Sequence, residues 1–555
     1  MKIGIDFGTT RIVVAAADRG NYPVVSFEAT DGEVHDWFPP IVAVRGDERR
    51  YGFDASQVQD EEGWTVVRSI KHLLSASGLA TRIELGSQTV PMMQLLRELA
   101  EALHAALRQN SSLRLKAGEP LETMLGVPAN AHSNQRFLTA EAFRSAGFQV
   151  MGLLNEPSAA SIELGHRDRV AGADEPRHTM LVYDFGGGTF DASLVELDQQ
   201  VHWVRASDGV STLGGDDFDE VLAELALDAA GIDAAERDRL SQATWFALHD
   251  SCRLHKEALH PNSRRIVIDL DSVVAGWPTV TIPVASFYEA CEPLVARTID
   301  TVDALLAQDS AARGEVTVDA VFMIGGASEL PVVARRLRDR YGRKVKRSAH
   351  PRSATAIGLA IQADTDAGYV VRDRFTRHFG VWREADSGAS VVFDPLYPKG
   401  QLLPGAGDPP LRVARSYHPS HNLGHFRFLE CSHLSPDGRP SGDITHWDEI
   451  RFPFVVPLAA LEDLSQVEVV HDPDAPQQDI EESFAVDAGG RVQVRLANRS
   501  AGYEREYRLG HWGERGEPIR PGRRRKPAAK ASRRSKLDAP DDAAPNAPAQ
   551  KGSIA

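Results

Sequence analysis

The sequence predicts an α/β region, an all-β region after it, and a disordered basic tail at the end of the chain. Over residues 1–365, apolar strand-like runs alternate with helix-patterned stretches, which is typical of α/β architecture. From about residue 375 to 510, short strand-like runs are separated by turn-forming residues, which indicates a β domain. Residues 511–555 are rich in Pro, Ala, Arg and Lys and almost lack aromatic residues, so we expect them to be disordered.

Apolar runs in the first region have the length of buried strands, and the stretches between them show helical spacing of apolar residues. The expected strands include residues 2–6, 11–17, 124–127, 180–184 and 320–324, and the expected helices include residues 91–107 and 290–306. At roughly 150 residues per domain, a chain of 555 residues has room for three or four domains.

The second region is expected to consist of short strands. Turn formers such as Asp437-Gly438 and the segment 487–490 punctuate its apolar runs. A short apolar-then-charged segment, residues 369–373, separates the two regions. The expected strands cover residues 390–393, 425–429, 449–455, 466–470 and 492–496.

Composition excludes several classes of protein. A formal net charge of −16 argues against non-specific binding of DNA or anionic membrane by the body of the chain. The sequence contains no run of 18 apolar residues, which argues against a membrane span. Residues 2–7 already have a strand pattern, which leaves no room for a signal peptide. Three scattered cysteines provide neither a disulfide framework nor a CxxC metal site. We therefore expect a cytoplasmic protein without a membrane span.

The tail carries a concentrated positive charge. Residues 520–536 hold nine basic residues and no acidic residue. Such a block can contact a nucleic acid, an acidic lipid surface or an acidic partner. A solvated tail without a partner is the simpler interpretation.

Two turns have the pattern of phosphate-binding loops. Residues 6–10 (Asp-Phe-Gly-Thr-Thr) follow one apolar strand and precede another. A tight turn of this kind directs backbone N–H groups and hydroxyl groups at a ligand above it. Asp6 stands at the end of the strand and can hold a hydrated Mg²⁺, which prefers one or two carboxylates together with waters and phosphate oxygens.

The same pattern recurs 178 residues later. Residues 184–191 (Asp-Phe-Gly-Gly-Gly-Thr-Phe-Asp) again lie between two apolar strands, and the pair Gly325-Gly326 ends another strand. The repetition indicates an internal duplication, with a nucleotide held between two similar lobes. The sequence contains no GxxxxGK[ST] motif, so the phosphates are not held by a P-loop.

These motifs resemble those of the actin/hexokinase/heat-shock ATPase superfamily, and specifically those of the DnaK-type heat-shock chaperones. The resemblance follows the order of the chain. The similar segments are a strand and proline turn at residues 125–136, an Asn-Glu-Pro segment at 154–160, a second phosphate-side loop at 213–219 and an adenosine motif at 322–331.

The resemblance implies a fold class and a set of domains. Residues 394–404 and 482–495 are similar to segments near the start and the end of the family's β substrate domain. The family's helical lid has no counterpart, so we expect a divergent, lidless member. The implied parts are a two-lobed actin-like ATPase domain at 1–365, a linker at 366–374, a β-sandwich-like substrate domain at 375–510 and a disordered basic tail at 511–555.

The resemblance also implies roles in catalysis. Lys71 would orient the attacking water and contact the γ-phosphate, and Thr189 would approach the same phosphate. Glu156 would orient a metal-bound water or couple the proline turn to the nucleotide state. Asp184 completes the implied catalytic group. This division fits phosphoryl transfer, which needs positioning and charge neutralisation more than covalent chemistry.

The implied cofactors are ATP or ADP, Mg²⁺ and K⁺. Asp6 and Asp184 would hold Mg²⁺ through water, and Asp191 would help to bind the monovalent cation. The residues implied to contact the nucleotide are Gly8, Thr9, Thr10, Gly186, Gly187, Gly188, Gly214, Gly215, Lys256, Gly325 and Gly326.

The adenosine side departs from the family pattern. Lys256 is kept, but Arg253 stands where a glutamate is usual, Glu257 where a basic residue is usual and His260 where a small hydroxyl residue is usual. Glu329 replaces an arginine that packs on adenine, and this exchange loses a planar, stacking donor. A compensating swap of Arg253 and Glu257 could preserve a local ion pair, whereas Glu329 has no evident compensation in the sequence. We therefore expect weakened nucleotide affinity.

Two partner surfaces also depart from the pattern. On the face that recruits J-domain cochaperones, Asn130, His132, Ser133 and Gly152 replace the usual residues, whereas Asp373 matches the linker aspartate. We therefore expect either a dedicated J-domain partner or none.

The first strand of the β domain carries charges where the family has peptide-contacting apolar residues. Arg383 and Glu384 would make a polar groove, which is costly to pair with an apolar client unless these charges stay solvated.

One function is favoured and one alternative stays open. The favoured interpretation is a slow ATP-hydrolysing chaperone whose nucleotide state is coupled to a lidless β domain that holds a specialised client polypeptide. The alternative is a nucleotide-dependent regulatory adaptor with little hydrolysis. A sugar kinase or a filament-forming actin relative is disfavoured, because neither has a use for the Asn-Glu-Pro segment and the β domain.

Overall fold

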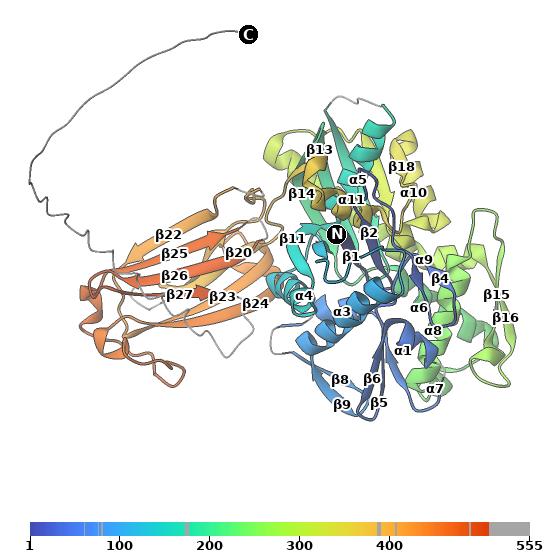
Figure 1. Ribbon diagram of the computed structural model, residues 1–555, viewed down its shortest axis with the longest axis horizontal. Coiled ribbons are helices and arrows are strands. Elements are labelled where there is room, and N and C mark those ends of the chain that lie inside the picture. The colour runs from blue at the N-terminus through green and yellow to red at the C-terminus, as the bar shows by residue number, and fades with distance from the viewer. Residues whose placement is uncertain are drawn as a thin grey trace, which may run out of the picture. The chain divides into compact units, whose positions relative to one another are not determined.

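The structure is a computed structural model that describes most of the chain up to residue 509 (Figure 1). The described residues belong to one unit by their contacts. The predicted tail at 511–555 lies outside the described residues, as does part of the predicted turn at 487–490. The described residues are 1–59, 61–75, 77–78, 81–172, 177–385, 390–405, 408–487 and 490–509.

The first α/β sheet is built around a hairpin that carries the first predicted phosphate loop. Strands β1 (Lys2–Phe7) and β2 (Ile12–Ala16) pair antiparallel, and β10 (Glu122–Val127) runs parallel to β1 on its other side. Strand β11 (Gln149–Asn155) completes the order β11-β10-β1-β2. All five residues of β2 are buried, as expected for a strand covered on both faces.

The second α/β sheet repeats this arrangement. Strands β12 (His178–Phe185) and β13 (Phe190–Asp198) form the hairpin, and β17 (Ala320–Ile324) runs parallel to β12. The core order β18-β17-β12-β13 matches β11-β10-β1-β2 strand for strand, which supports the predicted duplication. The sheet is completed by β18 (Val345–Arg347), β14 (Val201–Val210) and β19 (Val370–Arg372).

Two helices pack tightly against each other and against the first sheet. They are α5 (Glu156–Val170) and α11 (Ala354–Ala363). A Cβ atom on Gly358 of α11 would lie 1.8 Å from the Ala159 carbonyl oxygen of α5, so only glycine fits there. Gly4 of β1 has the same role, because its Cβ would lie 2.3 Å from the Ala360 nitrogen. This packing fixes the start of α5, which carries a predicted site residue.

The remaining elements of the α/β region surround the two sheets (Figure 1). The helices are α1 (Gly52–Gln57), α2 (Ile70–Ser75), α3 (Met92–Gln109), α4 (Ser133–Ser145), α6 (Gly215–Ala230), α7 (Ala234–Arg237), α8 (Gln242–Glu257), α9 (Val284–Arg313) and α10 (Pro331–Tyr341). The short strands are β3 (Phe27–Glu28), β4 (Val34–His35), β5 (Val42–Arg45), β6 (Glu48–Tyr51), β7 (Thr65–Val67), β8 (Arg82–Leu85), β9 (Gln88–Pro91), β15 (Arg265–Asp269) and β16 (Thr279–Pro283).

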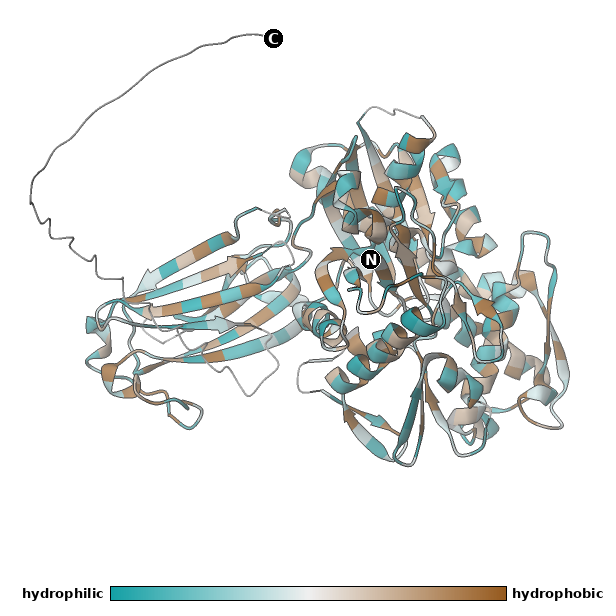
Figure 2. Ribbon diagram, in the orientation of Figure 1, coloured by the Kyte–Doolittle hydropathy of each residue, from teal (hydrophilic) through white to brown (hydrophobic). Residues whose placement is uncertain are grey.

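The all-β region is a sandwich of two antiparallel sheets, β21-β20-β23-β24 and β22-β25-β26-β27. One buried core, which includes Phe379, Phe428 and Phe484, draws on both sheets. Figure 2 shows hydrophobic and hydrophilic residues alternating along β22, β25 and β26, the pattern of strands with one face in a core. The strands are β20 (His378–Ala385), β21 (Ser390–Tyr397), β22 (Leu411–Tyr417), β23 (Leu423–Leu434), β24 (Pro440–Pro453), β25 (Ile480–Val486), β26 (Val492–Asn498) and β27 (Tyr503–Arg508).

The fold-class prediction is confirmed, with one wrong strand. Residues 466–470 form no strand, because Val470 instead exchanges hydrogen bonds with Asn422, through that residue's backbone N–H and its Oδ1. Part of the predicted linker forms β19, which pairs with β14. The exact domain boundaries stay predictions.

Among the described residues, no helix combines the length and the apolar character that crossing a bilayer requires. The cytoplasmic location stays a prediction.

Candidate nucleotide-binding site

The two predicted phosphate loops lie against each other beside one cavity. A Cβ atom on Gly187 would lie 2.8 Å from Thr10 Cγ2, and one on Gly188 would lie 2.9 Å from Thr9 Cγ2. The turns can approach this closely only because glycine has no side chain. The turn residues that line the cavity are Gly8, Thr9, Thr10, Gly186, Gly187 and Thr189.

The loop before α6 supports the second turn. A Cβ atom on Gly214 would lie 2.4 Å from backbone atoms of Gly187 and Gly188. The Gly215 N–H donates to the Gly186 carbonyl at 3.0 Å. Gly214 and Gly188 therefore position the loops from behind, whereas Gly215 lines the cavity.

A buried ion pair stands at the phosphate end of the cavity. Lys71 lies in α2 and Glu156 begins α5, and their Nζ and Oε1 atoms are 2.6 Å apart. The two residues are 4% and 5% exposed, so the pair is almost dry. Burial lowers the pKa of Lys71, but the charges of Glu156 and Asp6 outweigh it and hold that pKa above its ordinary value. Lys71 is therefore a fixed positive charge beside the loops.

Two aspartates occupy equivalent positions near the ends of β1 and β12, and both line the cavity. Burial, with the neighbouring Glu156, raises the pKa of Asp6 to about 7. The same two causes raise the pKa of Asp184 well above its ordinary value. A bound cation would relieve this repulsion, so the carboxylates fit a divalent metal.

The donor set also indicates which metal fits. The described part of the chain contains no group of three or more His, Cys, Asp or Glu side chains that could hold an ion. Mg²⁺ suits such a site, because it keeps several waters and takes phosphate oxygens beside one or two carboxylates.

Asp191, the predicted K⁺ ligand, lies deeper in the protein. Its side chain is buried and accepts a hydrogen bond from the Asn130 N–H at 3.4 Å. Burial and Glu156 raise its pKa to about 7. Asp191 is outside the set of residues found to line the cavity.

Lys256 and the glycine pair stand toward the other end of the cavity. Lys256 Nζ lies 2.7 Å from Asp219 Oδ1 and donates to the Gly215 carbonyl at 2.6 Å, so it fixes the loop before α6. Gly325 has a φ of +82°, and its Cβ would lie 2.3 Å from the Phe185 carbonyl oxygen. A Cβ atom built on Gly326 would point into open space, with no heavy atom beyond its chain neighbours within 4 Å among the described residues.

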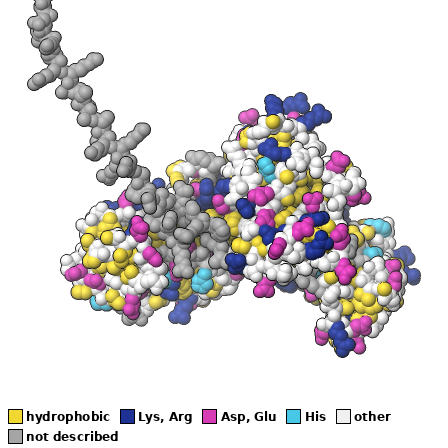
Figure 3. All heavy atoms as spheres, turned by 60° about the horizontal axis from the view of Figure 1, so that its bottom comes forward, with side chains coloured by type: hydrophobic (Ala, Val, Ile, Leu, Met, Phe, Trp, Pro, Cys, Tyr) yellow, Lys and Arg dark blue, Asp and Glu magenta, His cyan; other side chains and the backbone are white. Residues whose placement is uncertain are grey.

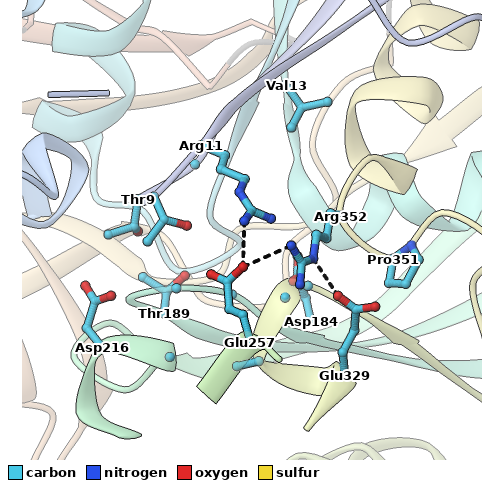
Figure 4. Close-up of a pocket in the computed structure, with 18 of the residues that line it drawn as sticks. Thr9, Arg11, Val13, Asp184, Thr189, Asp216, Glu257, Glu329, Pro351 and Arg352 are labelled. Atoms are coloured by element: carbon cyan, nitrogen blue, oxygen red, sulfur yellow. Dashed lines mark hydrogen bonds and ion pairs between the residues drawn. The ribbon is translucent and has the colours of Figure 1, made fainter. Parts of the chain in front are cut away.

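A chain of ion pairs lines the same end (Figure 4). Arg11 Nη2 lies 2.6 Å from Glu257 Oε2, and Arg352 Nη1 lies 3.1 Å from the same oxygen. Arg352 Nε in turn lies 2.5 Å from Glu329 Oε2. We call these four residues the charge ladder.

The ladder corrects two expectations. Glu329 does have compensation, because Arg352 pairs with it. Among the described residues, Arg253 and Glu257 do not form the ion pair that a swap of their charges could have preserved. Arg253 pairs with Asp250 at 2.5 Å, and Asp250 also lies 3.0 Å from Arg68.

Sequence reasoning missed Arg11 and Arg352. Arg11 directly follows the first phosphate loop and Arg352 directly follows Pro351, and neither position alone signals a base contact.

The two charged residues predicted to make the β groove polar form ion pairs within the sandwich. Arg383 Nε lies 2.7 Å from Asp394 Oδ2, and Arg383 Nη2 lies 2.7 Å from Glu482 Oε2, which belongs to a fully buried side chain. Glu384 Oε2 lies 3.0 Å from His421 Nδ1.

The predicted cochaperone face also has a partner within the chain. The Ser133 N–H donates to Glu430 Oε2 at 3.0 Å, and its hydroxyl donates to the same carboxylate. His132 caps α4 by accepting from the Gln135 N–H at 3.2 Å.

Two sheets of one topology, with glycine turns meeting at a cavity that holds buried acidic and basic side chains, define a two-lobed α/β protein of the actin-like class. The family model described as Hsp70 protein matches residues 2–375, so the chain belongs to the Hsp70 family. The predicted resemblance is thereby confirmed.

Similar curated proteins carry the name chaperone protein HscA. That of Serratia proteamaculans (strain 568) is 31% identical over 391 residues, and that of Pectobacterium atrosepticum (strain SCRI 1043) is 33% identical over 385 residues. An HscA homolog of Pseudomonas fluorescens (strain Pf-5) is 30% identical over 384 residues. Each match covers 66% of this chain and 58% of the relative.

Proposed function

We propose that this protein is an ATP-hydrolysing chaperone whose nucleotide state is coupled to a polypeptide client on the β sandwich. Membership of the Hsp70 family and similarity to proteins named chaperone support the proposal. The observation that carries it is the buried Lys71–Glu156 pair beside two phosphate-type turns. Phosphoryl transfer requires this kind of positioned positive charge.

Each residue of the site has a share in the proposed reaction. Lys71 contacts the γ-phosphate and orients the attacking water, and Glu156 holds the ammonium group in place. The Thr189 hydroxyl donates to the same phosphate, and the glycine turns offer backbone N–H groups. When bound, Mg²⁺ neutralises phosphate charge, and Asp6 and Asp184 would hold it through water.

The K⁺ site is proposed on less direct grounds. Asp191 is a buried carboxylate in β13, close enough to Lys71 and Glu156 for their charges to affect its pKa. Such a position suits a monovalent cation behind the phosphates.

Contacts lead from the phosphate end to the linker. Asn155, directly before Glu156, donates from Nδ2 to Asp373 Oδ2 at 2.6 Å. Asp373 also accepts a hydrogen bond from Ser158 Oγ at 3.4 Å and directly follows β19. A movement of Glu156 with nucleotide state would therefore reach the linker through the first turn of α5.

The client is proposed to be specialised. Arg383, Asp394 and Glu482 form a paired charged network inside the sandwich, and an apolar client segment could not replace their partners. A dedicated J-domain cochaperone, an acidic or nucleic-acid partner of the tail, and the absence of a lid stay predictions.

The alternative function is a regulatory adaptor that binds nucleotide and barely hydrolyses it. The altered adenosine side, with Glu257 and Glu329 where the family has basic residues, leaves this alternative open. Only the rate of the chemical step separates the two functions.

Single-turnover ATP hydrolysis by the full chain tests the proposal. We expect Mg²⁺-dependent turnover that falls about 100-fold or more in Lys71→Ala, while ADP binding changes little, because a transition-state contact is lost. The control is Lys116→Ala, which removes an exposed lysine. Equal rates in Lys71→Ala and the parent would remove Lys71 from the mechanism. No measurable turnover in the parent, with nucleotide bound, would establish the adaptor.

A further inference from the structure

The cavity has two chemically different ends. Glycine turns, hydroxyl groups and Lys71 line one end, and the charge ladder of Arg11, Glu257, Arg352 and Glu329 lines the other. A nucleotide with its phosphates on the turns must place its base near the ladder. The residues that could hydrogen-bond a base there therefore include these charged side chains, and Leu259, Leu330 and Pro351 add apolar surface to the cavity.

The ladder joins the two sides of the cavity. Arg11 directly precedes β2 of the first sheet, and Glu257 ends α8 on the side of the second sheet. Burial by itself raises the pKa of Glu257, but Arg11 and Arg352 outweigh it and hold that pKa below its ordinary value. Glu257 is therefore charged near neutral pH and stands between two guanidinium groups.

The other residues found to line the cavity narrow the choice of base. None of them is aromatic, so no ring is available for stacking, and none is Asn or Gln. An amide side chain is the usual bidentate partner of adenine at N6 and N7, whereas arginine is the usual bidentate partner of guanine at O6 and N7. Carboxylates accept from N–H donors such as guanine N1–H and N2–H.

Two donors at this end lack a partner. The Nε atoms of Arg11 and Arg253 are buried and have no hydrogen-bond acceptor among the described residues. Both residues line the cavity. Buried unpaired donors are unfavourable, so they favour a ligand that brings acceptors such as a carbonyl oxygen and a ring nitrogen.

We propose that the base end of this site accepts guanine at least as readily as adenine, with arginine of the ladder reading O6 and N7 and glutamate accepting from N1–H and N2–H. The inference rests on the proposed nucleotide binding. The ladder side chains are between 20% and 39% exposed, so exchanging one of these ion pairs for hydrogen bonds to a base costs little.

Equilibrium binding of ATP, GTP and tripolyphosphate to the full chain tests the inference. We expect the dissociation constant of GTP to be lower than that of ATP, equal to it, or at most about threefold higher. Arg352→Gln should weaken GTP binding about tenfold and ATP binding less than about threefold, because glutamine cannot donate to both O6 and N7. Tripolyphosphate binding should not change, which shows that the variant is folded.

Arg336→Gln is the matched control, because it breaks an exposed ion pair with Glu292 away from the cavity. Binding of ATP more than about threefold tighter than GTP would overturn the inference alone. Equal weakening of both nucleotides by Arg352→Gln would also overturn it, since the ladder would then be structural. Absence of binding by either nucleotide would overturn the proposed function as well.

Discussion

Lys71 is a charge that the protein tolerates in its interior because carboxylates lie beside it, and Glu156 is the one that forms an ion pair with it. Removing one partner of a buried pair leaves the other unpaired, which costs more than replacing both with apolar groups. The pair therefore contributes to stability as well as to the proposed chemistry, and the two contributions can be separated.

We expect Glu156→Ala to lower the free energy of unfolding by about 3–5 kcal/mol, because it leaves the Lys71 ammonium buried and unpaired. The double variant Lys71→Met/Glu156→Leu should lose clearly less. Chemical denaturation of the parent, Lys71→Met, Glu156→Leu and the double variant measures the coupling. A double variant as unstable as the sum of its single changes would show that the two side chains do not interact.

His202 predicts an acid-dependent loss of stability. It is fully buried, burial lowers its pKa to about 4, and its Nε2 has no partner among the described residues. The unfolded chain takes up a proton near pH 6.5, about where free histidine titrates, whereas the folded protein resists until about pH 4. Stability contributed by this residue is thus present above pH 6.5 and falls as the pH drops toward 4.

Between pH 7.5 and pH 5.0, the parent should lose about 2 kcal/mol of unfolding free energy through this residue. Over the same pH range, the unfolding free energy of His202→Gln should fall by about 2 kcal/mol less than that of the parent. The exposed His418→Gln is the control and should behave as the parent does. Equal pH dependence in all three proteins would show that His202 is not the acid-sensitive group.

At the scale of elements, helices α5 and α11 are in close backbone contact at Gly358. We expect Gly358→Ala to destabilise the protein by about 1–3 kcal/mol or more, although alanine is the better helix former, because the new methyl group would meet backbone. Gly152→Ala is the control, since its Cβ would meet Met124 at an ordinary 3.5 Å and should change stability by less than about 0.5 kcal/mol. Thermal unfolding of both variants gives the comparison.

Elements with a continuous apolar pattern could be predicted, and contacts between distant residues could not. Strand β17 matches its predicted range because all five of its residues are buried, so its sequence carries one signal. Residues 466–470 carry a similar signal, but hydrogen bonds to Asn422 hold that segment outside any sheet.

The candidate site divides in the same way. Its glycine turns are local in sequence and could be found from spacing. The charge ladder joins Arg11 to Glu257 and Arg352 to Glu329, and no local pattern relates these positions.

At the scale of the whole molecule, the surface of the described residues carries charges of both signs. On the face shown in Figure 3, acidic and basic side chains lie interspersed among hydrophobic and neutral groups. Neither sign of charge is therefore gathered into one field on this face. Interactions through it should be short-ranged at physiological salt, where the screening length is about 8 Å.

Coupling between the α/β region and the sandwich predicts a nucleotide-dependent linker. Arg372 pairs with Asp408 at 2.5 Å, and Arg374 donates to the carbonyl groups of Val204 and Gly400, both at 2.8 Å. If ATP shifts the contacts of Glu156, trypsin should cut at these arginines at different rates with ATP and with ADP. Limited proteolysis of the full chain measures the rates. Identical patterns with ATP, with ADP and without nucleotide would favour the static adaptor.

The interlocked glycine turns have a mechanical consequence. Gly187 and Gly188 touch Thr10 and Thr9 so closely that the two lobes cannot slide past each other there. They can only rotate about that point, which then acts as a fulcrum. Phosphates bound at a fulcrum move little, whereas parts of the two lobes that lie far from it open and close through a wide arc. Nucleotide could therefore enter and leave by a swing of the outer lobes while the loops that hold its phosphates keep their shape.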